Sequence, residues 1–185
     1  MRSYRVLKNQ VFENGKYSIV PIRSDDRHDI MKWRNDQIYH LRQKELLSKE
    51  TQDKYFLNVV EKLFDLSSPN QLLFSFLKDQ KCVGYGGLVH INWEDKHAEI
   101  SFVMKTSLEN DYFHEYWSEY LDLIEKVAFE DIKFNKIFVY AFDLRPRLYE
   151  VMNDSLYTNE AVLKKHHMFN NQYVDVLIFS KFNKK

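Results

Sequence analysis

The alternation of apolar and polar residues is clearest between Val83 and Met104, where the chain reads VGYGGLVHINWEDKHAEISFVM. It runs up to Asn92 and resumes after Lys96. A period of two residues that stops at a polar segment and starts again predicts two strands joined by a tight turn. Glycine weakens a strand unless another group must approach the backbone closely, so the glycines of the first strand predict such an approach. They are Gly84, Gly86 and Gly87.

The register of this pair follows from its turn. If the turn centres on Glu94 and Asp95, the numbers of facing residues have a constant sum. His90 then lies opposite Glu99, and Leu88 lies opposite Ser101. We therefore expect an imidazole against a carboxylate in the middle of a sheet.

The remaining periodicities predict three strands and two helices before this pair, and a helix, a strand, a helix and a closing hairpin after it. This order indicates an α/β (α+β) fold with a mixed, mostly antiparallel central sheet and about four helices. The expected strands outside the central pair are Tyr4 to Val11, Tyr17 to Arg23, Leu72 to Leu77, Lys136 to Phe142, Glu160 to Phe169 and Tyr173 to Phe182. The expected helices are Asp29 to Asp36, a helix capped by Ser48 with apolar positions to Phe64, Tyr112 to Glu130, and Arg145 to Asp154.

Composition narrows the class of protein. A chain of 185 residues with 44% hydrophobic residues favours one domain, 1–185, with a substantial core. Lysine plus arginine and aspartate plus glutamate both number 27, so no net field favours nucleic acid or a membrane surface as a partner. The single cysteine, Cys82, and the lack of a long apolar run favour a protein of the reducing cytoplasm.

Several segments, in this order, resemble the GNAT superfamily of N-acetyltransferases, and in particular its branch that acetylates ribosomal-protein N-termini and amino sugars of nucleotide-sugar pathways. The resemblance extends from about Tyr17 to Phe182. The segments are MKWRND, the two central strands, VAFEDIKFNKIFVY and EAVLKKHHMFNNQYVDVLIFS.

The resemblance implies a site for acetyl-CoA between two diverging strands, Ala98 to Met104 and Lys136 to Phe142. Pantetheine would pair with the backbone of the first strand, and the pyrophosphate would lie at the N-terminus of the next helix. Arg145 would lie near the 3′-phosphate or the adenine, although a charged loop explains it as well. No metal is implied. The cofactor-binding residues implied are Phe102, Val103, Met104, Lys105, Leu108, Asn110, Asp111, Tyr112 and Arg145.

The segment from Lys105 to Glu115 departs from the family, because it lacks the usual glycines and carries Glu109, Asp111 and Glu115. Carboxylates that faced a pyrophosphate would repel it, whereas bare amides from Leu108 to Tyr112 could still bind it. Two interpretations stay open: a variant loop that binds CoA, or a non-catalytic binding module that has lost tight CoA binding.

The expected catalytic residues are Glu99, His90 and Tyr149. Glu99 would remove a proton from the acceptor amine, directly or through water, with His90 tuning or relaying it. A purely structural pair of these two residues is the alternative. The general acid of the family falls on Tyr149 in one alignment register and on Met152 in another.

The acceptor is expected to be a small-molecule or peptide amine, with a nucleotide-linked amino sugar as the first choice and a protein N-terminus as the second. Trp33 and Arg34 belong to the helix that borders the acceptor pocket in the resembled branch, and Ser101 shares a strand face with Glu99. A core tryptophan beside a solvated arginine is an equally ordinary interpretation. A homodimer is possible.

Overall fold

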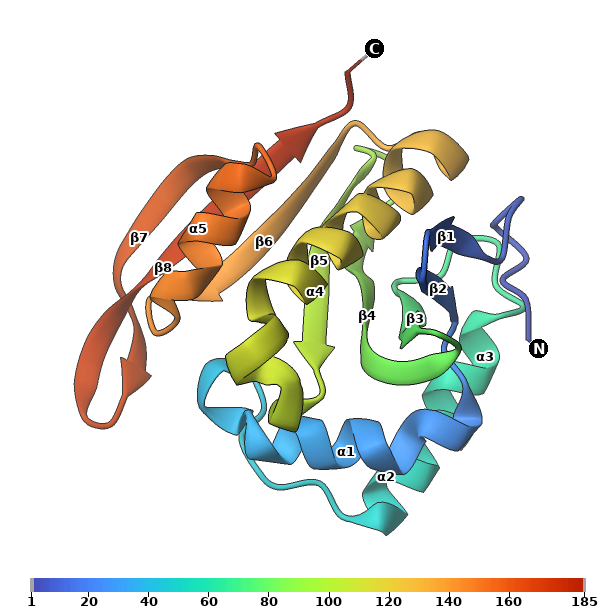
Figure 1. The fold of residues 1–185 in the computed structure, drawn as a ribbon, viewed down its shortest axis with the longest axis horizontal. Helices are drawn as coiled ribbons and strands as arrows, with labels where there is room; N and C mark the ends of the chain where they lie inside the picture. Colours follow the sequence, from blue (N-terminus) through green and yellow to red (C-terminus); the bar gives the residue numbers. More distant parts are fainter. Residues whose placement is uncertain (1, 185) are drawn as a thin grey trace.

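The computed structural model describes residues 2–184, and its strands form one eight-stranded sheet in the order β1-β2-β3-β4-β5-β6-β8-β7 (Figure 1). Neighbouring strands are antiparallel except β5 and β6, which are parallel. The expected mixed, mostly antiparallel sheet is therefore confirmed. The strands are β1 (Phe12–Asn14), β2 (Tyr17–Pro21), β3 (Leu72–Lys78), β4 (Lys81–Asn92), β5 (His97–Met104), β6 (Lys136–Phe142), β7 (Thr158–Phe169) and β8 (Gln172–Phe182).

Four helical segments accompany the sheet, as expected. A π-helical turn at residues 56–60 joins α2 to α3, so these two form one continuous helix. Ser48 caps it, with its side chain accepting a hydrogen bond from the Thr51 amide. In Figure 1, α4 crosses in front of β4 and β5, and α1 runs across the end of β5. The helices are α1 (Arg27–Asp36), α2 (Lys49–Tyr55), α3 (Glu61–Leu63), α4 (Glu109–Glu125) and α5 (Pro146–Asp154).

The first segment of the chain differs from the prediction. Strand β1 pairs with β2 in a hairpin, but β1 covers only Phe12–Asn14, and the residues expected to form a strand from Tyr4 to Val11 are irregular. Tyr4 is 1% exposed, and its hydroxyl donates to the carbonyl of Leu73 at 2.8 Å. Tyr4 and Leu7 therefore enter the core individually instead of lining one face of a strand.

The register of β4 with β5 is displaced by one residue from the prediction. Val89, not His90, faces Glu99, because β4 contains a bulge between Val89 and Asn92. His90 has a positive φ of 49° in this bulge. Leu88 consequently faces Ile100, and the residue opposite Ser101 is Gly87. A bulge adds one residue to one strand, and hydrophobic alternation does not reveal it.

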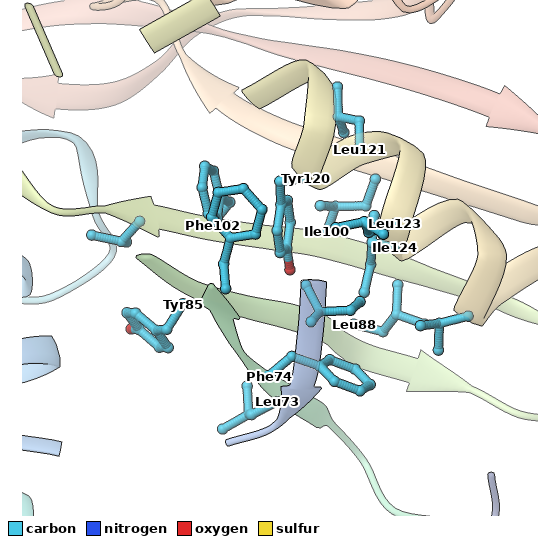
Figure 2. Close-up of a cluster of buried hydrophobic side chains, with 14 of the residues drawn as sticks. Leu73, Phe74, Tyr85, Leu88, Ile100, Phe102, Tyr120, Leu121, Leu123 and Ile124 are labelled. Carbon is cyan, nitrogen blue, oxygen red and sulfur yellow. The ribbon is translucent and has the colours of Figure 1, made fainter. Parts of the chain in front are cut away.

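The glycines of β4 are explained by close approaches within the protein. A Cβ atom on Gly86 would lie 2.0 Å from the carbonyl oxygen of Ser101 and 2.6 Å from the Tyr120 hydroxyl. Figure 2 shows Tyr120 extending from α4 toward the sheet beside Phe102, and the two rings stack at 4.0 Å. The expected close approach is therefore made by the core, in which the apolar side of α4 is buried as predicted.

Candidate functional site

Strands β5 and β6 separate part-way along their length. Their parallel pairing ends at Glu99 and Phe138, while β6 continues to pair with β8 as far as Phe142. The divergence expected between these two strands is therefore observed. It opens a gap in the middle of the sheet, beyond Glu99.

The edge of β5 presents peptide groups to this gap. The amide of Lys105 donates to the carbonyl of Val83 at 2.8 Å, so odd-numbered residues of β5 direct their peptide groups toward β4. Ile100, Phe102 and Met104 therefore direct theirs toward the gap, where β6 no longer pairs with them. The Met104 carbonyl accepts a hydrogen bond from the side chain of Gln37, which leaves Ile100 and Phe102 for an extended ligand.

A cavity occupies the gap. Its walls are the diverging halves of β5 and β6, with Trp117 of α4 and Leu148 of α5 also contributing. Most of its polar groups are basic, and Glu99 is the one carboxylate among the lining residues that the structure describes. The charged and polar lining residues are Arg34, His40, Arg42, Glu99, Ser101, Tyr140 and Arg145.

Glu99 is the buried acid of this cavity, with 6% of its surface exposed. Burial raises the pKa of its carboxyl group, while Arg42 and then His90 act to lower it. His90 is mostly exposed, and its Nε2 lies 3.9 Å from Oε2 of Glu99. The predicted proximity of the two side chains therefore holds despite the register error, but the imidazole is exposed and is not among the residues that line the cavity.

Arg42 and Tyr140 are site residues that the sequence did not reveal. The Arg42 guanidinium pairs with the Glu99 carboxylate and lies 4.9 Å from the centre of the Tyr140 ring. Arg42 belongs to the irregular segment between α1 and α2, whereas Tyr140 lies on β6. No periodicity or motif connects residues so distant in sequence, so only the fold brings them together.

A second cavity lies on the side of α1 and α2, and it shares Arg34 and Ser101 with the first. Arg34 is fixed by hydrogen bonds from Nη1 to the Tyr85 hydroxyl at 2.6 Å and from Nε to Oε1 of Gln43 at 2.9 Å. No carboxylate is among the described residues that line this cavity. Its lining is Ile22, Ile30, Arg34, Leu47, Gln52, Tyr55, Phe56, Gln71, Leu73, Tyr85, Val89 and Ser101.

The residues expected to bind the substrate therefore do not all lie at a cavity. Arg34 and Ser101 border both cavities. Trp33, in contrast, is 4% exposed, belongs to the hydrophobic core and lines neither cavity. The reason is its position on the inner face of α1, where it is buried together with Ile30.

The expected phosphate-binding segment begins with a short 3₁₀ turn at Thr106–Leu108. The Leu108 amide donates to the carbonyl of Lys105 at 2.9 Å, so it is not bare as the sequence suggested. Lys105, Asn110 and Asp111 are exposed, whereas Tyr112 is half-buried and stacks on Tyr116 at 5.3 Å. Phe102, Val103 and Met104 are buried.

Arg145 reaches the start of α4. Its Nη2 lies 2.6 Å from Oε1 of Glu109, and this carboxylate thus pairs with an arginine that also lines the first cavity. The sequence prediction placed Arg145 near the cofactor but gave it no partner. The two residues are 36 positions apart, so neither helical nor strand spacing indicates the pair.

Tyr149 lies on α5, outside the lining of the first cavity. Its hydroxyl donates a hydrogen bond to the Asp143 carboxylate, and its ring stacks on Phe179. Burial and then Asp143 raise the pKa of this phenol. Met152, the other candidate position, is fully buried and carries no proton to donate. The role of Tyr149 as general acid stays a prediction.

Within residues 2–184, no group of three or more histidine, cysteine, aspartate or glutamate side chains could hold a metal ion. Over the same residues, none of the helices combines the length and apolarity needed to cross a membrane.

Comparison with known proteins identifies the fold and the family. The profile of the acetyltransferase (GNAT) domain matches residues 19–178. The chain belongs to the GNAT acetyltransferase family. This family transfers an acetyl group from acetyl-CoA to an amine, so the expected class of enzyme, an N-acetyltransferase, and its cosubstrate are confirmed. No curated protein matches the chain in sequence.

Solved structures show how widely this GNAT fold is shared. Spermidine N-acetyltransferase from Vibrio cholerae, in complex with CoA and spermine, superposes with a TM-score of 0.77 at 14% identity, over 92% of this chain and 97% of that one. A dodecameric structure of the same enzyme gives 0.73 at 14% identity, over 91% and 95%. A protein described as a probable acetyltransferase gives 0.70 at 15% identity, over 93% and 96%. At these identities the likeness concerns the fold.

Proposed function

We propose that this GNAT acetyltransferase acetylates a primary amine by direct attack within a ternary complex with acetyl-CoA. The amine nitrogen forms a bond to the thioester carbonyl carbon, the carbon–sulfur bond breaks, and the amine loses one proton while the thiolate gains one. The gap between β5 and β6 supports this proposal, because it combines free peptide groups, a buried acid and two lining residues, Arg34 and Ser101, that it shares with the second cavity.

The peptide groups of Ile100 and Phe102 are suited to bind pantetheine. Their spacing of two residues along one strand edge matches an extended chain with amide groups of its own, as in the addition of a strand to a sheet. Acetyl-CoA supplies the activated acetyl group when it is bound there. Phe102 and Trp117 then exclude water from this part of the cavity, because both are buried and pack edge to face at 5.0 Å.

Glu99 is the proposed base. Burial favours its neutral form, so its pKa lies closer to neutral pH than that of an exposed glutamate, and a base is most useful in this range. The mostly exposed His90 provides a route for the proton to solvent. Tyr149 remains the proposed acid for the thiolate, although its hydroxyl would have to leave Asp143 to reach the cavity.

The second cavity is proposed to hold the acceptor. A guanidinium binds phosphate and carboxylate groups, and the tyrosines and glutamines beside Arg34 suit hydroxyl-rich ligands. A polyamine requires carboxylates instead, and none is among the described lining residues. These features support a nucleotide-linked amino sugar as the acceptor, with a protein N-terminus as the second choice. The nature of the acceptor rests on this lining and on the resemblance to one branch of the family.

Calorimetry with acetyl-CoA, followed by thiol release with three acceptors, tests the proposal. The acceptors are a nucleotide-linked amino sugar, a peptide with a free N-terminus, and spermidine. We expect heat of binding with acetyl-CoA and the fastest turnover with the amino sugar. Preference for spermidine would refute the proposed class of acceptor. Absence of both binding and turnover would refute the proposed reaction and favour the non-catalytic binding module. The expected homodimer stays a prediction, which sedimentation equilibrium can check.

A further inference from the structure

Glu109, the first residue of α4, is a buried carboxylate with a buried partner. The side chains of Glu109 and Arg145 are only 11% and 9% exposed, and their ion pair measures 2.6 Å. Taking both charges out of water carries a desolvation penalty that their attraction only partly offsets. Hydrophobic residues of similar volume would serve packing as well, so the pair calls for an explanation other than stability.

The surroundings of Arg145 are arranged around its positive charge. Its Nη1 lies 3.3 Å from Nδ1 of His40, and its guanidinium lies 4.8 Å from the centre of the Phe113 ring. Burial and then Arg145 itself lower the pKa of His40 to about 3, so the neutral imidazole accepts a hydrogen bond from Arg145. The guanidinium is thus held in place by acceptors and a ring face, with Glu109 as its anion.

A second guanidinium lies on the same ring. Arg147 is exposed, its guanidinium lies 4.6 Å from the centre of the Phe113 ring, and its Nη1 donates to the Glu109 carbonyl at 3.2 Å. Two guanidinium groups therefore lie at the start of α4, and one of them, that of Arg145, pairs with the Glu109 carboxylate and also lines the first cavity. Because β5 leads directly into this region, pantetheine bound along Ile100 and Phe102 would carry its phosphates toward these arginines.

We propose that Arg145 and Arg147 bind the diphosphate of CoA, and that the Glu109 carboxylate occupies the anion position while the site is empty. This inference rests on the proposed function. Arrival of the diphosphate displaces the carboxylate from Arg145, so Glu109 weakens CoA binding and at the same time holds the empty site in its binding geometry. The arrangement explains how a segment without glycine, whose Leu108 amide is already bonded, can still receive a phosphate. It also assigns a role to Glu109, an acidic residue that was expected to repel a pyrophosphate.

Two ligands that differ in phosphate content test this role: CoA, and pantetheine, which has no phosphate. In calorimetry, Glu109→Gln should tighten CoA by about tenfold, because it removes one negative charge a few ångströms from the diphosphate. The same variant should leave pantetheine within about twofold of the wild-type affinity. Arg145→Gln should weaken CoA by about tenfold or more and leave pantetheine unchanged. Asp122→Asn removes an exposed carboxylate farther along α4 and should change neither affinity.

Equal effects of Glu109→Gln on CoA and pantetheine, or weaker CoA binding in this variant, would overturn the inference and leave a structural ion pair. If the unpaired arginine prevents folding of Glu109→Gln, the double variant Glu109→Gln with Arg145→Gln replaces the pair by two neutral amides. That protein should lose the preference for CoA over pantetheine, and a preserved preference would refute the role of Arg145. The proposed function fails separately, when the wild-type protein binds neither ligand.

Discussion

Arg42→Gln is the substitution that tests the proton transfer most closely. The Arg42 guanidinium pairs with Glu99 and lies over Tyr140, and its side chain is 47% exposed. Burial raises the pKa of Glu99, and Arg42 is the larger of the two influences that lower it, ahead of His90. Without the guanidinium, burial still raises the pKa of Glu99, but the largest influence that lowers it is gone. The pKa of Glu99 should therefore rise further.

The magnitude follows from the exposure of the two partners. Exposed ion pairs contribute up to about 1 kcal/mol, whereas two charges 4 Å apart interact by about 4 kcal/mol at an effective dielectric constant of 20. Because Glu99 is buried and Arg42 is half exposed, we expect their interaction free energy to be about 1 to 2 kcal/mol. This corresponds to a change of roughly one unit in the pKa of Glu99. A base must be deprotonated to act. The acidic limb of the rate profile should therefore move to higher pH by about one unit.

The assay is kcat/KM for acetyl-CoA-dependent thiol release, measured from pH 5 to pH 9 at about half-unit steps, since this ratio reports the free enzyme. Arg42→Lys keeps a positive charge and should restore most of the wild-type profile. His90→Gln should shift the limb in the same direction by less, because His90 is mostly exposed and 3.9 Å from the carboxylate. An acidic limb that stays in place in Arg42→Gln, or moves to lower pH, would refute the role of Glu99 as base.

The pKa of Glu99 also has a consequence for stability. A carboxyl group whose pKa is higher in the folded protein than in the unfolded chain contributes stability at low pH. This contribution is present below its ordinary pKa and is lost as the pH rises through the raised value. Arg42→Gln should therefore destabilise the protein more at pH 8 than at pH 4, which urea denaturation at the two pH values can measure.

Two further substitutions test the framework and the general acid. Gly86→Ala should lower the free energy of unfolding in urea by about 3 kcal/mol, because the new Cβ would lie 2.0 Å from the Ser101 carbonyl oxygen. Gly15→Ala, in open space at a positive φ of 58°, should lower it by only about 1 kcal/mol, and equal losses would contradict this packing account. Tyr149→Phe should lower kcat by about 100-fold at unchanged CoA affinity if Tyr149 protonates the thiolate, and an unchanged kcat would transfer that role to Tyr140, the tyrosine that lines the cavity.

Local signals in the sequence predicted most of the fold. The alternation in β4 and β5 and the Ser48 cap both act between neighbouring residues, and each is present in the structure. The order of elements and the family followed from these signals together with the resemblance. The prediction of a strand from Tyr4 to Val11 was wrong because Tyr4 and Leu7 are buried by distant parts of the chain, as the hydrogen bond from Tyr4 to Leu73 shows.

The site was less accessible to sequence reasoning. Glu99, Arg34 and Ser101 could be selected as polar residues on elements that were predicted correctly, and the structure brings all three to the cavity between β5 and β6. The pairs of Glu99 with Arg42 and Glu109 with Arg145 join segments far apart in the sequence, and no spacing rule connects them. The bulge at His90 likewise depends on how β4 fits its neighbours, so the predicted register was wrong by one residue.

Hydrogen exchange of the β5 amides, measured by NMR with and without acetyl-CoA, tests the central claim most directly. Ile100 and Phe102 direct their peptide groups into the gap, whereas Ser101 between them directs its own toward β4. The account predicts that saturating acetyl-CoA slows exchange at Ile100 and Phe102 and leaves Ser101 unchanged. Binding of acetyl-CoA with no added protection at these two amides would contradict it.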